Sequence, residues 1–417
     1  MRGIREGLLF VGLLGSAIDV GAMESQYRHF SPEITPSEAD DVSSEEKTPR
    51  APLNASQRMK YALLYNVIDP NQVSATGKSL LEGALESAVL DPTAESLEII
   101  HLLLENGACI NCILSNGETP LTFALGTKNI ELIREVMIMG PDYTFSNVDG
   151  DTPLHIAIQT VNEPIFKYLL AKQRKNSLSK SNQQGETPLD IAIQLGLQDF
   201  AIQLVDLYNI RDLDRESGCG CTPLMLAIEE GNSPNIVKAL ISRGVRIDQT
   251  SSMEGRTALH YAAQNGNLWA LEYLIANGAE IDVKDFHGVT PLYLALDSDQ
   301  RRLNSVALLL DRGAAIDQIF PGGETALHFA AAKGDTELGE LLLERGAALE
   351  ARNSRRQTPL YVAARSGQQP FVMMLVERGA KLQESPSPLS GAILSEDPEL
   401  VQYFLKQDTI GSYETNR

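Results

Sequence analysis

Cysteine, tryptophan, histidine and positive charge are all scarce in this chain. Its 417 residues include four cysteines, one tryptophan and six histidines. So few cysteines cannot form a disulfide framework in a chain of this length, and side-chain packing must therefore stabilise the fold. The 35 lysines and arginines are outnumbered by 55 aspartates and glutamates, and the net charge of -20 repels the phosphates of nucleic acids. We therefore expect no nucleic-acid partner.

A long hydrophobic run is also missing. The longest apolar stretch, residues 7–18, has about 12 residues, whereas a bilayer-spanning helix needs about 20, so we expect no transmembrane segment. Two arginines precede this stretch and three small residues follow it, a pattern typical of a signal peptide cleaved before Met23. The alternatives are that Met23 is the true start and residues 1–22 are an upstream extension, or that this stretch is a buried or frayed apolar segment. A signal peptide implies a secreted protein, whereas a start at Met23 implies a cytoplasmic one.

The remaining segments differ in composition. Residues 23–53 are expected to form a disordered acidic linker, because residues 31–46 contain six acids, no base and little apolar surface. Residues 54–75 place apolar side chains at helical spacing, which predicts an N-terminal capping helix. Residues 407–417 are expected to form a flexible tail. The stretch between, residues 76–406, is periodic.

A hexapeptide close to Thr-Pro-Leu-His-x-Ala recurs through this stretch. Successive threonines are 33 or 35 residues apart, and weaker copies at Ser79 and Ser387 flank them, which makes about ten repeats. Most units also carry a leucine-rich second helix pattern that ends in a pair such as Gly278-Ala279. The threonines are Thr119, Thr152, Thr187, Thr222, Thr257, Thr290, Thr325 and Thr358.

This double pattern resembles the ankyrin-repeat family, whose period is about 33 residues and whose signature is T-P-L-H-x-A. The resemblance covers about four-fifths of the chain and implies an all-α solenoid of about ten helix-turn-helix units with β-turn fingers. Because one helix pair cannot bury both of its faces, we expect a single continuous domain. The resemblance also implies that the histidine of the hexapeptide bridges its own threonine turn and the adjacent repeat. These histidines are His155, His260 and His328.

Two further sets of residues have structural roles in one unit. A threonine at the N-cap accepts a backbone N–H bond, and a proline loses nothing at the next position. A glycine after helix two allows the left-handed conformation that ends a helix. The N-cap threonines of the histidine-containing units are Thr152, Thr257 and Thr325. Typical helix-ending glycines are Gly278, Gly313 and Gly346. The acids Asp248, Asp282 and Asp317 recur after such turns, which favours a scaffold role for them.

Some positions depart from the pattern. Gln173 and Tyr208 stand where other repeats have the helix-ending glycine. The irregular fingers around residues 172–221 indicate either a partner-specific surface or degeneration. Arg356 replaces the turn glycine of the ninth unit. It lies in the only dense basic patch of the sequence, with Arg352, Arg355 and Arg365.

Motifs for catalysis are absent. The sequence has no G-x-x-x-x-G-K loop, no H-E-x-x-H and no G-x-S-x-G. Cys109 and Cys112 with Cys219 and Cys221 suggest a zinc site. However, three repeats at a helix spacing of about 8 to 10 Å separate the pairs by about 25 to 30 Å, too far for Zn–S bonds of about 2.3 Å. A local disulfide between Cys109 and Cys112 is the alternative to free thiols. We expect no cofactor, no metal and no enzyme; an enzyme with an unrecognised site is the less favoured alternative.

The function class that remains after these exclusions is recognition of another protein. Finger tips and the exposed face of helix one are free of packing roles. We expect a monomeric, non-catalytic scaffold or adaptor whose concave face binds a protein with a basic surface or a basic peptide. The alternative is a regulatory or inhibitory subunit, in which the acidic tail or the irregular central repeats gate the groove. The candidate partner contacts are Met253, Glu254, Arg256, Trp269, Phe286, His287, Arg355 and Arg356.

Overall fold

The computed structural model describes residues 55–64, 68–75, 77–90, 92–172, 178–231, 234–298 and 302–414. The predicted signal peptide or extension, the acidic linker and Gln173 lie outside these ranges. All regular elements within them are helices, apart from one isolated bridge between Val73 and Ser79. The all-α prediction is confirmed. No helix within these ranges has the length and apolar content needed to cross a bilayer.

The chain divides between Ile191 and Ala192, inside α10 (Pro188–Gln194), into two compact units. The repeat pattern predicts one continuous domain, and we describe each unit by itself. Before α10, the N-terminal unit contains α3 (Ala55–Leu64), α4 (Leu80–Leu90), α5 (Ala94–Glu105), α6 (Pro120–Thr127), α7 (Ile130–Ile138), α8 (Pro153–Gln159) and α9 (Glu163–Lys172).

The C-terminal unit follows the same alternation. Its helices are α11 (Gln198–Leu207), α12 (Ile210–Leu213), α13 (Pro223–Glu229), α14 (Pro234–Ser242), α15 (Ala258–Gln264), α16 (Leu268–Ala276), α17 (Pro291–Asp297), α18 (Arg302–Asp311), α19 (Ala326–Lys333), α20 (Thr336–Glu344), α21 (Pro359–Arg365), α22 (Gln369–Glu377), α23 (Pro388–Leu394) and α24 (Pro398–Glu414). From α13 onward, odd and even labels mark the first and second helices of successive repeats.

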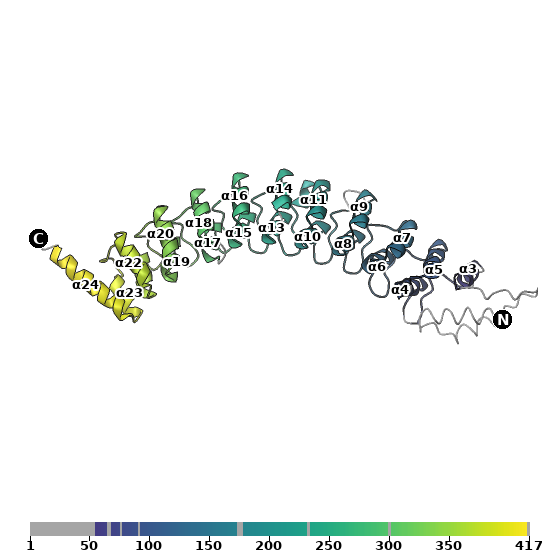
Figure 1. Ribbon diagram of the computed structural model, residues 1–417, viewed down its shortest axis with the longest axis horizontal. Helices are drawn as coiled ribbons and strands as arrows, with labels where there is room; N and C mark the ends of the chain where they lie inside the picture. The colour runs from purple at the N-terminus through teal and green to yellow at the C-terminus, as the bar shows by residue number, and fades with distance from the viewer. Residues whose placement is uncertain are drawn as a thin grey trace, which may run out of the picture. The chain divides into compact units, whose positions relative to one another are not determined.

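First helices contact first helices, and second helices contact second helices. In the C-terminal unit α13, α15, α17, α19 and α21 form one row, and α14, α16, α18, α20 and α22 form the other (Figure 1). Small side chains allow the first row to approach closely. Ala262 and Ala263 of α15, and Ala330 and Ala331 of α19, are fully buried. The repeats therefore bury one another's apolar faces, as expected for a solenoid.

The N-terminal helix is shorter than predicted. The sequence predicts a helix over residues 54–75, whereas α3 ends at Leu64, and Pro70 further on cannot continue a helix. Met59 and Leu63 are buried, and α3 packs on α5. It therefore covers the second helix of the first repeat.

Two other boundaries differ from the predicted pattern. Tyr208 ends α11 in an extended conformation and is almost fully buried, and the short α12 follows it. No helix-ending glycine stops α24, which continues to Glu414, past the predicted boundary at residue 406. Both differences occur where the Gly-Ala pair is missing from the sequence.

Candidate functional site

The fingers are fixed to the helices by the hexapeptide residues. In the eighth repeat His328 Nδ1 lies 2.8 Å from Thr325 Oγ1 and accepts the Thr325 N–H, while Nε2 lies 2.9 Å from the backbone oxygen of Gln357 in the next finger. His260 makes the same contacts with Thr257 and the oxygen of Val289. His155, Thr152 and the oxygen of Glu186 repeat them in the N-terminal unit. Each ring therefore joins one finger to the next.

These contacts define the state of the imidazoles. A backbone N–H can only donate, so Nδ1 of each ring accepts, and Nε2–H donates to the carbonyl. Each ring is thus the neutral tautomer protonated at Nε2. Burial lowers the pKa of His155, His260 and His328, which is consistent with a structural role.

Other side chains occupy the histidine position elsewhere. Asp190 Oδ2 accepts the N–H and the hydroxyl of Thr187, both at 2.8 Å. Glu82, buried in the first repeat, accepts the N–H and the hydroxyl of Ser115 in the next finger. Sequence analysis missed this role of Glu82. The signal was its place three residues after Ser79, as His155 stands three after Thr152.

The recurring acids also join repeats. Asp248, Asp282 and Asp317 accept the backbone N–H groups of Glu280, Ala315 and Ala348, the residues that follow the next Gly-Ala pair. Asn71 and Asn111 do the same for Cys109 and Asp142. The glycines of these pairs have positive φ, 95° at Gly278, 99° at Gly313 and 92° at Gly346. The acids are thus engaged in the scaffold, as the sequence predicts.

Two consecutive finger tips expose large apolar side chains. Met253 is 70% and Phe286 is 67% exposed. Each lies over the turn glycine of the preceding finger, where a Cβ added at Gly220 or Gly255 would clash with it. Phe286 N–H also donates to the oxygen of Glu254 at 3.0 Å. Sequence analysis missed other exposed apolar residues on fingers, among them Val148 and Ile319; Val148 precedes its threonine by the same interval as Phe286.

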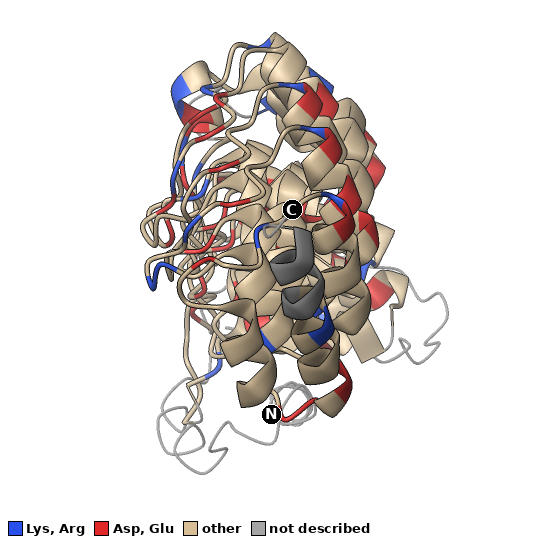
Figure 2. Ribbon diagram, turned by 90° about the vertical axis from the view of Figure 1, so that its left-hand side faces the viewer, with Lys and Arg blue, Asp and Glu red and all other residues tan. Residues whose placement is uncertain are grey.

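The charged candidates fall into two groups. Arg256 is only 18% exposed and pairs with Glu254 at 2.9 Å and with buried Asp285 at 3.4 Å. The guanidinium of Arg256 is therefore engaged in ion pairs within the chain. His287, Arg355 and Arg356 are exposed, and both acidic and basic residues mark the projecting loops of Figure 2.

The basic patch is held by its own turn. Arg356 has a φ of 60°, so it adopts the left-handed conformation of the glycine that it replaces. Neighbouring Arg352 pairs with Glu384 and donates to the oxygens of Arg356 and Ser385. Arg355 and Arg356 form no ion pair with any described residue, and their charges face solvent.

Trp269 is half-buried on the outer helix α16. It stacks on Tyr273 with ring centroids 5.1 Å apart, and Lys238 Nζ lies 5.6 Å from its ring centroid. Trp269 therefore packs on a residue of its own helix and lies beside the neighbouring helix α14.

Two finger carboxylates in the N-terminal unit are paired with amides instead of cations. Asn147 Nδ2 donates to Glu118 at 3.2 Å, and Asn182 Nδ2 donates to Asp151 at 3.0 Å. Neither carboxylate forms an ion pair with a residue in the described part of the chain. These amide bonds leave the negative charges of the fingers uncompensated.

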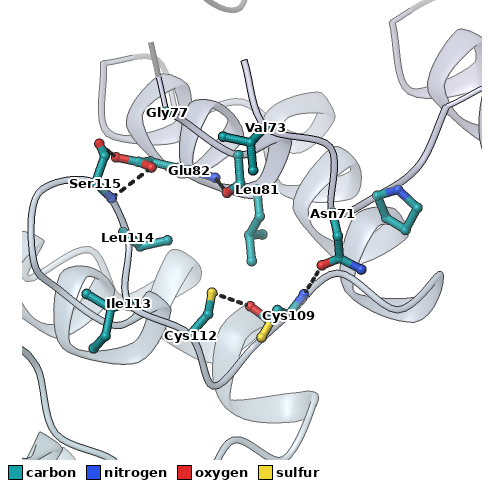
Figure 3. A pocket seen from close by; sticks show the side chains of 12 residues that line it. Asn71, Val73, Gly77, Leu81, Glu82, Cys109, Cys112, Ile113, Leu114 and Ser115 are labelled. Carbon is teal, nitrogen blue, oxygen red and sulfur yellow. Dashed lines mark hydrogen bonds between the residues drawn. The ribbon is translucent and has the colours of Figure 1, made fainter. Parts of the chain in front are cut away.

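A small hollow of about 280 Å³ lies beside the first two repeats, lined in part by Asn71, Glu82, Cys109 and Cys112 (Figure 3). All four cysteines of the chain are free thiols. Within the described ranges, no cluster of three or more His, Cys, Asp or Glu side chains is placed to hold a metal ion.

Comparisons with known proteins identify the class of protein that these stacked helix pairs form. Residues 85–179, 127–214, 205–285, 224–320 and 301–385 match the family described as "Ankyrin repeats (3 copies)". The chain therefore belongs to the ankyrin-repeat family. The repeats form a protein–protein interaction domain.

Individual relatives cover parts of the chain. The putative ankyrin repeat protein FPV223 of Fowlpox virus is 35% identical over an alignment of 133 residues. The alignment covers 25% of this chain and 94% of that protein. The B-cell lymphoma 3 protein homolog of Mus musculus is 36% identical over 106 residues, 24% of this chain and 23% of that protein. The palmitoyltransferase AKR1 of Lachancea kluyveri is 34% identical over 107 residues, 25% of this chain and 14% of that protein.

Proposed function

We propose that the fingers of the C-terminal unit bind a protein partner and that the chain acts as a non-catalytic scaffold or adaptor. The observation that carries this proposal is the pair of exposed tips, Met253 and Phe286, on consecutive fingers. Large apolar and aromatic side chains that protrude from a fixed backbone are typical anchors of protein interfaces. His287 beside Phe286 offers a polar contact at the rim.

Preorganisation supports the same assignment. Backbone bonds join each of these fingers to the one before it: Ser252 N–H donates to the oxygen of Gly220 in the preceding finger, and Phe286 N–H donates to the oxygen of Glu254. The Arg256 ion pairs with Glu254 and Asp285 hold the base of the same fingers. Association then orders few additional groups, which lowers its entropic cost.

We further propose that the partner presents a basic surface or a basic peptide and that the chain is monomeric. Support comes from the net charge of -20, which attracts a basic surface and disfavours association between copies of the chain. Binding should therefore weaken as salt screens the charges. A salt-independent affinity would contradict this part of the proposal.

The regulatory alternative rests on a different observation. Arg355 and Arg356 are exposed and unpaired among the described residues, and residues 31–46 carry six acids and no base. An acidic segment that occupies these arginines would compete with a partner. Deleting residues 23–53 should then tighten partner binding, whereas a plain scaffold binds equally well with or without the segment.

Crosslinking with the fingers altered tests the main proposal. The Met253→Ser/Phe286→Ser variant should lose the crosslinked partners that the wild-type chain retains. Met373→Ser, in helix α22, removes an exposed apolar side chain away from the fingers and should retain them. The finger variant should melt like the wild type, because Met253 and Phe286 are largely exposed; Met373 is 39% exposed, so its variant is compared with the wild type by circular dichroism before use. Equal recovery of partners by the finger variant would contradict the proposal.

A further inference from the structure

Cys109 and Cys112 are the two ends of a four-residue turn that follows α5. Ile110 and Asn111 form the turn between them. Cys109 is exposed, whereas Cys112 is half-buried and lines the hollow beside the first repeat. The two cysteines are therefore close in sequence, and Cys109 is the more exposed of the two.

The two cysteines are in contact. Cys112 Sγ donates to the backbone oxygen of Cys109 at 3.0 Å (Figure 3). The pKa of Cys112 is raised to about 11; burial is the largest cause, and a hydrogen bond with the Cys109 thiol is the second. Cys112 is therefore a thiol at neutral pH, and an electrophile from solution meets Cys109 first.

The backbone permits a bond between them. The first and fourth residues of a turn have Cα atoms within about 7 Å, and a disulfide joins Cα atoms about 4.4 to 6.8 Å apart. The turn is also held from both sides. Asn71 Oδ1 accepts the Cys109 N–H at 2.8 Å, and Glu82 accepts the Ser115 N–H at 3.1 Å.

We infer that Cys109 and Cys112 form a reversible oxidation site, at which a small-molecule disulfide such as glutathione disulfide converts the dithiol into an intramolecular disulfide. The Cys109 thiolate attacks glutathione disulfide and forms a mixed disulfide, releasing one glutathione thiolate. Cys112 then loses its proton to solvent and attacks the Cys109 sulfur, releasing the second glutathione. Two protein thiols are oxidised and one glutathione disulfide is reduced to two glutathiones.

The other cysteine pair provides an internal comparison. Only Gly220 separates Cys219 from Cys221, and Cys221 is buried with its sulfur 3.3 Å from the Tyr261 hydroxyl. Burial raises the pKa of Cys221 to about 12. The exposed Cys219 can accept glutathione, but Cys221 is buried and in contact with Tyr261, so we expect it to resolve the mixed disulfide more slowly than Cys112 does.

Mass spectrometry of the folded full-length chain tests this inference. The chain is incubated with glutathione disulfide, the remaining thiols are alkylated, and proteolytic peptides that contain residues 109–112 and 219–221 are assigned separately. The expected 109–112 peptide is lighter by two hydrogens, takes up neither glutathione nor alkylating reagent, and returns to the dithiol with dithiothreitol. The Cys112→Ser variant should instead stop at glutathione on Cys109.

Three results would overturn the inference. They are a 109–112 peptide of the wild-type chain that keeps glutathione, one in which both cysteines are alkylated, and one crosslinked to a second chain. The Cys219→Ser/Cys221→Ala variant, if its circular dichroism matches the wild type, should give the same 109–112 product. If that variant fails to fold, peptide assignment in the wild-type chain alone decides the question.

Discussion

The carboxylate of Glu82 accepts hydrogen bonds from both the backbone N–H and the hydroxyl of Ser115, one repeat further along the chain. It occupies the position that His155, His260 and His328 hold in other repeats, and like them it is buried. A carboxylate and an imidazole thus both join one finger to the next, although they do so at different points: each imidazole donates to the residue just before the next threonine, whereas Glu82 accepts from a residue four positions before Thr119.

Replacing Glu82 with alanine should destabilise the N-terminal unit by about 2 kcal/mol, because two charge-assisted hydrogen bonds are lost. Urea denaturation measures this loss. Glu86→Ala is the matched control, since Glu86 forms only a partly exposed ion pair with Lys78, and it should shift the midpoint much less. Similar shifts for both variants would mean that the Ser115 contacts contribute little.

Acidification should destabilise the fold between about pH 7 and pH 5. Burial lowers the pKa of His155, His260 and His328 in the folded state, whereas an unfolded histidine titrates near 6.5. Below that value the unfolded chain binds more protons, so the free energy of unfolding falls as the pH falls.

The histidine contribution can be isolated at one position. His260→Thr imitates the Thr119–Thr122 pair already present in the chain and removes one titrating group. Its free energy of unfolding should change less steeply with pH over the same range, as measured by urea titrations at several pH values. An unchanged slope would assign the pH dependence to other groups.

Asp317→Ala should cost about 1 kcal/mol, because the Ala348 N–H loses an acceptor at 2.9 Å. Asp317→Asn should cost much less, since Asn71 and Asn111 make the equivalent bond with an amide oxygen. Thermal melting of the two variants distinguishes loss of the acceptor from loss of the charge. Equal destabilisation by both would show that the charge is what counts.

Two substitutions at positive φ should act in opposite directions. Gly278 has a φ of 95° and open space around its Cα, so Gly278→Ala introduces backbone strain alone and should destabilise by about 1 kcal/mol. Arg356 has a φ of 60°, so Arg356→Gly relieves strain and should stabilise by up to about 1 kcal/mol. Denaturation midpoints that move in the same direction would contradict the argument.

Much of the fold was predictable, because the same residues that begin and end helices recur in most repeats. The N-cap threonines, the prolines after them and the glycines after helix two each have a single-residue explanation, and the helices begin and end where these residues stand. The ends were predicted less well. α3 is shorter and α24 longer than expected, because Pro70 cannot continue a helix and no Gly-Ala pair ends the last one.

The candidate surface was predictable only in part. A tip position identifies Phe286 and Met253, but sequence cannot tell an outward arginine from one that folds back. Arg256 turns toward Asp285, while Arg355, three fingers further along the chain, remains exposed. Such choices depend on which charge the next finger offers, and that juxtaposition exists only after the repeats have stacked.

The bonds made by Asp248, Asp282 and Asp317 affect how the fold tolerates the deletion or insertion of a repeat. Each offers the same acceptor to the same amide in the following copy. If residues 283–317 were excised, Asp282 would meet Ala348 in the place of Asp317 and this inter-repeat bond would be kept, while the Arg256–Asp285 ion pair would be lost. Deleting or inserting a whole repeat should therefore destabilise the fold less than deleting or inserting a few residues, because a whole repeat keeps the acid and the amide of this bond in register.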